Sequence, residues 1–187
     1  MDAPLSRKGK LRLLEIAREA IFYRLQRGSV PPFSVNEPEL MQPAGAFVSL
    51  HLDGQLRGCI GNLHSDHPLH EVVAEMAVEA ATGDPRFPSL SSKELPKTEI
   101  EISVLTPFVP LSPEEVVVGK HGLYMVRGPK RGVLLPQVAQ QYGWTAEEFL
   151  QHTCRKAGLA PDAYLDKDTR IFGFEAEVFS NDSMHET

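Results

Sequence analysis

The residues whose chemistry stands out form one short run, Leu56-Arg57-Gly58-Cys59-Ile60-Gly61. Arg57 brings a permanent cation, Cys59 brings a thiol, and the two glycines permit a close approach of backbone. An arginine binds carboxylate or phosphate through its planar fork, and a cysteine is a nucleophile once deprotonated. Because glycine weakens a strand interior, we expect a ligand, a partner or a second segment of the chain to lie against this run.

A hairpin is predicted to position this run, with a first strand, a two-residue turn and a returning strand at 46–52, Asp53-Gly54 and 55–60. With that turn, Leu50 faces Arg57 and Val48 faces Cys59. Side chains alternate along a strand, which places Arg57 and Cys59 on one face, roughly 7 Å apart at Cα. We therefore expect the guanidinium to bias the thiol toward thiolate.

Further motifs along the chain occur in the order found in a known family. They are GAFVSL at 45–50, DPRFP at 84–88, EISVL at 101–105, VGKHG at 118–122, LPQVA at 135–139, GW at 143–144 and KAGL at 156–159. Together with LRGCIG they resemble the AMMECR-one domain family, known in prokaryotes as AmmeMemoRadiSam system protein A. The resemblance covers nearly the whole chain. It implies a two-lobed α+β fold with no settled biochemical activity, and relatives associated with a Memo-like protein and a radical-SAM protein.

The periodicity also predicts an α+β fold, with a mixed or mainly antiparallel sheet packed with helices and a smaller inserted α/β lobe. A first helix is expected from Ser6 to about Arg27, with a buried face of Leu11, Leu14, Ala17, Ile21 and Leu25. Alternation over 170–179 predicts one strand that returns to the main sheet. We expect a single domain, 1–187, whose parts are a main lobe at about 6–115 and 169–180, a sub-lobe at about 116–168 and a flexible tail at 181–187.

Composition limits the function classes. The 187 residues carry a net charge of −6, which argues against non-specific nucleic-acid binding, and no basic patch with interleaved aromatics supports RNA recognition. Two distant cysteines are no disulfide framework, so a reduced, cytoplasmic setting is the simplest expectation. No apolar run is long enough to span a membrane. No dinucleotide, P-loop or zinc-protease fingerprint is present, so no cofactor is predicted.

The site is expected in a cleft beside the hairpin, where the two lobes meet. Cys59 is the candidate nucleophile, and His121 is a candidate base if the fold brings it close. Arg57, Gly58, Gly61, Asp84 and Arg86 are the candidate ligand-binding residues.

A structural role is the alternative for each of these candidates. Cys59 could be an inert buried thiol, and Arg57 could form an internal ion pair with a strand glutamate such as Glu101. Asp84 and Arg86 could simply hold their own turn together. Cys154 lies on an apolar helical stripe and is expected in the core.

Three histidines with a spacing of three, His64, His67 and His70, invite a metal hypothesis. Pro68 interrupts any common helix, so the three need not converge, and we expect solvated loop histidines and no metal site.

Two hypotheses of different class follow. In the first, the chain is an enzyme in a modification pathway, with Cys59 as nucleophile and Arg57 holding an anionic group. Alternatively it is a non-catalytic binding or adaptor module that recognises a protein partner or a small anionic ligand. The family resemblance suggests the Memo-like or radical-SAM protein as that partner, and an RNA-binding regulator is a third, weaker idea.

Overall fold

The computed structural model describes residues 4–181, and these divide into two compact units. The first unit takes the chain up to Leu105 and again from Glu177, and the second unit is Thr106–Ala176. Except for Asn181, the tail predicted at 181–187 lies outside the described residues. Within the described part of the chain, no helix combines the length and apolar character that a membrane crossing requires.

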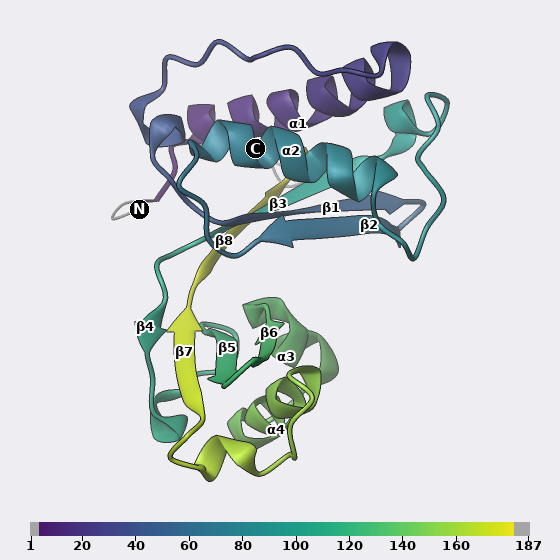
Figure 1. Cartoon of the computed structure of the whole chain (residues 1–187). Coiled ribbons are helices and arrows are strands. Elements are labelled where there is room, and N and C mark those ends of the chain that lie inside the picture. The colour runs from purple at the N-terminus through teal and green to yellow at the C-terminus, as the bar shows by residue number, and fades with distance from the viewer. Residues whose placement is uncertain (1–3, 182–187) are drawn as a thin grey trace. The chain divides into compact units, whose positions relative to one another are not determined.

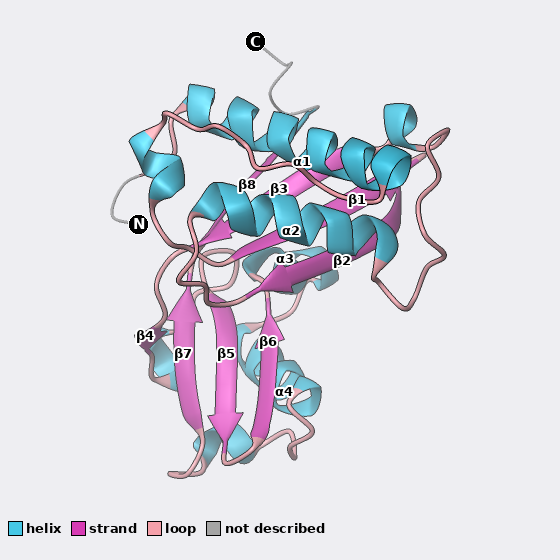
Figure 2. Ribbon diagram, turned by 45° about the horizontal axis from the view of Figure 1, so that its top comes forward, coloured by secondary structure: helices cyan, strands magenta, loops and turns pink. Residues whose placement is uncertain are grey.

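The first unit is an antiparallel sheet with two helices on one face. Its strands lie in the order β2-β1-β3-β8, with bounds Gln55–Asn62, Ala46–Leu52, Glu99–Leu105 and Ala176–Ser180. Figures 1 and 2 show α1 (Arg7–Arg27) and α2 (Leu69–Thr82) side by side over that face. Short 3-10 turns, η1 (Pro38–Met41) and η2 (Leu95–Lys97), complete the unit. The predicted α+β class is confirmed.

Helix α1 has clear start and stop signals. The Ser6 side chain accepts a hydrogen bond from the Gly9 amide, and Gly28 ends the helix with φ of 73°. Leu14, Ala17 and Ile21 are fully buried or nearly so, as the periodicity predicts, whereas Leu11 is 37% exposed. The buried face of α1 therefore excludes Leu11, and it includes Leu13 and Ile16, which were not predicted.

The second unit has its own sheet and core. Its strands lie in the order β4-β7-β5-β6, with bounds Val109–Pro110, Arg170–Phe174, Gly122–Arg127 and Lys130–Leu134. Its remaining elements are η3 (Pro113–Glu115), α3 (Pro136–Tyr142), α4 (Ala146–Lys156) and η4 (Ala163–Leu165). A capping box of Thr145 and Glu148 starts α4, which buries Phe149 and Cys154 against Leu123.

The single strand predicted at 170–179 is wrong, because the chain changes sheet at Glu175. Strand β7 pairs with β5 and β4 in the second unit, and β8 joins the first sheet. At the change, the Thr106 amide donates to the Glu175 carbonyl at 2.9 Å, and the Glu175 amide donates to the Thr106 hydroxyl at 2.8 Å. Residues 106–115 and 169–176, predicted in the main lobe, accordingly lie in the second unit.

Candidate functional site

The hairpin of β1 and β2 forms as predicted, but its register differs by one residue. Asp53 and Gly54 make the turn, with φ of 52° and 75°. Leu50 pairs with Gly58 and not with Arg57, because the register shifts between Leu50 and His51 and leaves Arg57 as the extra residue of a β-bulge. Cys59 consequently pairs with Ser49, whereas the turn alone predicted Val48.

Arg57 is held by the loop that follows α2. Its Nε donates to Glu94 Oε1 at 3.0 Å, and its two Nη atoms donate to the carbonyls of Pro88 and Ser89 at 2.7 and 3.4 Å. The Arg57 side chain is 14% exposed. Arg57 thus forms an internal ion pair, as the structural alternative predicted, but with Glu94 and not with Glu101. Hydrogen bonds from Ser91 and Arg57 lower the pKa of Glu94 to about 2.

Asp84 and Arg86 clamp the backbone of Cys59 from the outer edge of the sheet. The Cys59 amide donates to Asp84 Oδ2 at 2.9 Å, and Arg86 Nη2 donates to the Cys59 carbonyl at 3.2 Å. Arg86 also donates to both oxygens of Asp84, which holds the pKa of that buried carboxyl well below its usual range. Both residues therefore reach the hairpin, and they satisfy edge groups of β2 that would otherwise be unpaired.

Both glycines of the run serve close packing inside the first unit. A Cβ atom on Gly58 would collide with the carbonyl oxygen of Ala80 in α2, and one on Gly61 would collide with the ring of Phe47. Of the ligand, partner or second segment expected against this run, the structure shows a second segment of the chain at both glycines.

The Cys59 thiol lies in a row of polar groups across three strands. The Ser49 hydroxyl is 3.2 Å from the Cys59 sulfur, and Ser49 also pairs with Glu101 on β3. Burial raises the pKa of Glu101, and the nearby His51 opposes that shift. This row on the sheet face opposite α1 and α2 combines a thiol, a hydroxyl and a carboxyl group. Sequence reasoning missed Ser49 and His51, although their alternation with Phe47 was a usable signal.

His121 belongs to the second unit and is held there. Its Nδ1 accepts a hydrogen bond from the Val117 amide at 3.2 Å. Its role as a base for Cys59 stays a prediction. Cys154 is fully buried in the core of the second unit, as predicted, with its sulfur 3.3 Å from that of Met125, and burial raises the pKa of its thiol.

The three spaced histidines differ in their surroundings. His67 is solvated, with a 75% exposed side chain 3.6 Å from Glu71. His70 is 5% exposed and its Nδ1 lies 3.1 Å from the Leu40 carbonyl, so the prediction of a solvated histidine is wrong there. The reason is that His70 falls in the first turn of α2, on a face packed against η1. Within residues 4–181, no group of three or more His, Cys, Asp or Glu side chains is arranged so that it could hold a metal ion.

Comparison with known proteins gives matches over nearly the whole chain. A family model described as AMMECR1 matches residues 14–179. A protein of Methanothermobacter thermautotrophicus is 45% identical over 188 residues, covering 96% of this chain and 98% of that protein. A protein of Thermococcus gammatolerans is 41% identical over 182 residues, covering 91% and 89%. The crystal structure of uncharacterized protein PH0010 from Pyrococcus horikoshii gives a TM-score of 0.85 at 40% identity, covering 90% of this chain and 89% of that chain.

Proposed function

The chain belongs to the AMMECR1 family, and on that premise we propose that it acts as a non-catalytic binding or adaptor module. The observation that carries this proposal is the internal use of the charged groups in the two motifs beside Cys59. Arg57 is bonded to Glu94 and to two carbonyls, and Asp84 and Arg86 are bonded to each other and to the Cys59 backbone. Both arginines thus have their charge paired with a carboxylate of the first unit, Arg57 with Glu94 and Arg86 with Asp84. Such ion pairs stabilise a surface, whereas a cation that holds an anionic substrate needs its charge unpaired.

A protein partner fits this proposal better than an anion bound at Arg57. The guanidinium that would receive the anion is largely buried under the 88–94 loop. The family resemblance suggests a Memo-like protein or a radical-SAM protein as the partner, and the chain would then support a modification pathway without performing the chemistry.

The test is direct binding between purified proteins. The full chain is titrated with the Memo-like and the radical-SAM protein of the same organism in a calorimeter, and the mixtures are sized by light scattering. We expect a defined complex with one of them, and an affinity that Cys59→Ser changes less than twofold. Absence of a complex with both proteins, or a complex that Cys59→Ser abolishes, would contradict the proposal.

A thiol-dependent enzyme is the second candidate, favoured by the row of Cys59, Ser49 and Glu101. It requires a thiolate that reacts rapidly below pH 7. Cys154→Ala leaves Cys59 as the only thiol, so its alkylation rate is measured against pH and compared with a free cysteine peptide. A rate above that of the peptide at pH 6 would favour the enzyme. A rate at or below the peptide's is expected for the adaptor.

A further inference from the structure

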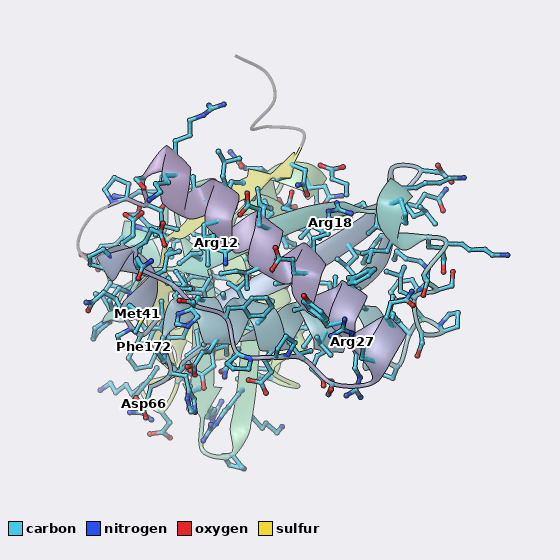
Figure 3. All side chains as sticks on the ribbon, turned by 90° about the horizontal axis from the view of Figure 1, so that it is seen from above. Arg12, Arg18, Arg27, Met41, Asp66 and Phe172 are labelled. Atoms are coloured by element: carbon cyan, nitrogen blue, oxygen red, sulfur yellow. The ribbon has the colours of Figure 1, made fainter. Side chains whose placement is uncertain are left out.

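Two neighbouring hollows in the first unit share Arg18 and Pro96. The first, of about 540 Å³, is lined mainly by apolar side chains of α1 and η2, among them Phe22, Tyr23 and Leu95. The second, of about 370 Å³, is polar and lies at the end of the sheet beside the β1–β2 turn. In Figure 3, Arg18 lies on the side of α1 that faces the β3 and η2 region. It is the cation common to both hollows.

Arg18 is a half-buried cation that has no carboxylate partner in the described part of the chain. Its two Nη atoms donate to the carbonyls of Leu95 and Thr98, both at 2.7 Å. Among the salt bridges of residues 4–181, none involves Arg18. Desolvation lowers the pKa of its guanidinium. Buried charges in proteins are normally paired, and a guanidinium has five N–H donors, so Arg18 retains donors for a further acceptor.

We propose that the two hollows form one groove for a small amphipathic monocarboxylate, whose carboxylate binds Arg18 and whose apolar body packs on Phe22, Tyr23 and Pro96. Arginine is suited to carboxylate because its N–H groups match the two oxygens. The volume of the apolar hollow falls in the range of about 300–1,000 Å³ that small-molecule sites occupy. This site is separate from Cys59 and does not depend on the adaptor function.

Charges in the polar hollow narrow the ligand class further. Lys97 adds a second cation near Arg18, but Asp53 and Glu99 also line this hollow, and Glu19 lines the apolar one. These carboxylates would repel a second anionic group on the ligand. The groove therefore accepts one negative charge and disfavours dicarboxylates.

The test uses 2-naphthoate and its neutral analogue 2-naphthalenemethanol, titrated into the full chain by calorimetry and by ligand-observed NMR. We expect the carboxylate to bind at least about tenfold more tightly than the alcohol, because a hydrogen bond to a charged group adds about that much affinity. We also expect 2,6-naphthalenedicarboxylate to bind more weakly than 2-naphthoate. Equal binding of acid and alcohol, or no binding of the acid at millimolar concentration, would overturn the proposal without any variant.

Variants then locate the site. Arg18→Met should reduce acid binding about tenfold more than it reduces alcohol binding, because only the acid gains the charged hydrogen bonds. The matched control is Arg24→Met on the same helix, since Arg24 is exposed and its side chain donates, among residues 4–181, to the Gly28 carbonyl alone. Phe22→Ala, at a side chain that is 48% exposed, should weaken both ligands and keep the core intact. Equal effects of Arg18→Met and Arg24→Met, or no effect of Phe22→Ala, would place the ligand elsewhere.

Discussion

Replacing Arg57 with methionine should destabilise the first unit by about 3 kcal/mol, taken as two charged hydrogen bonds at about 1.5 kcal/mol each. The two bonds counted are those to Glu94 at 3.0 Å and to the Pro88 carbonyl at 2.7 Å. The contacts of Arg57 Nη2 with the Ser89 carbonyl and with Glu94 Oε2, both at 3.4 Å, are left out of the sum because they are long. The side chains of Arg57 and Glu94 are also 14% and 28% exposed, so solvent partly screens their charges. Methionine retains the apolar stem, so the change removes mainly the charged head.

The assay must report on the first unit. Trp144, the single tryptophan of the sequence, lies in the second unit, so its fluorescence follows the other half of the chain. Urea unfolding is therefore followed by far-UV circular dichroism together with amide hydrogen exchange in β2. At this chain length, a loss of about 3 kcal/mol corresponds to a lower melting temperature by roughly 6–12 °C.

A matched control and a double-mutant cycle distinguish the loss of the Arg57–Glu94 ion pair from a general loss of charge. Arg127→Met removes a more exposed pair, with Asp166 at 2.6 Å and side chains 38% and 52% exposed, and should cost no more than about 1 kcal/mol. Arg57→Met combined with Glu94→Gln should show a coupling energy of at least about 1 kcal/mol. A loss below about 0.5 kcal/mol in Arg57→Met would refute the reasoning and return Arg57 to the role of a free ligand-binding cation.

Two further stability predictions concern the same edge of the sheet. Gly58→Ala should cost about 2–3 kcal/mol in urea unfolding, because the new methyl group meets the Ala80 carbonyl oxygen and neither backbone can yield easily; a neutral effect would contradict the packing. Acid should also weaken this edge. The pKa of Glu94 is about 2 in the folded state against an ordinary 4.5, and that of Asp84 is shifted in the same direction. A carboxyl with a depressed folded-state pKa stabilises fully above the ordinary value and loses that contribution as pH falls toward the folded value. Urea midpoints between pH 5 and pH 2.5 should therefore fall less steeply in Glu94→Gln than in the unaltered chain, and parallel profiles would count against the assignment.

Local signals in the sequence predict most elements of the fold. Asp53-Gly54 requires left-handed backbone, which fixed the first turn correctly, and the capping box at Thr145 marked the start of α4. The end of the last strand was misplaced because the apolar alternation continues through Glu175, where the chain leaves one sheet for the other. The buried face also changes there: Phe174 is buried in β7, whereas in β8 Phe179 is buried and Val178 is 43% exposed, so the apolar alternation does not mark a single buried face.

Some neighbours of the hairpin were predictable, and their contacts were less so. The glycines and the Asp84–Arg86 pair were expected at the hairpin, and they lie there. A glycine such as Gly58 inside a strand signals a bulge or a close backbone approach but does not decide between them. The extra residue at Arg57 shifts every later pairing, so Cys59 lies opposite Ser49 and not Val48. Glu94 lies 37 residues from Arg57, and only tertiary structure determines which of several glutamates an arginine reaches.

The two hydrogen bonds between Thr106 and Glu175 have a consequence for how this chain can be modified. They join the places where the chain leaves the first sheet and comes back to it, so the whole of Thr106–Ala176 is an insertion whose ends are already adjacent. A short turn between β3 and β8, which are neighbouring strands, would close the first unit as an ordinary hairpin. The second unit can therefore be deleted, or replaced by another domain, at the single junction between β3 and β8.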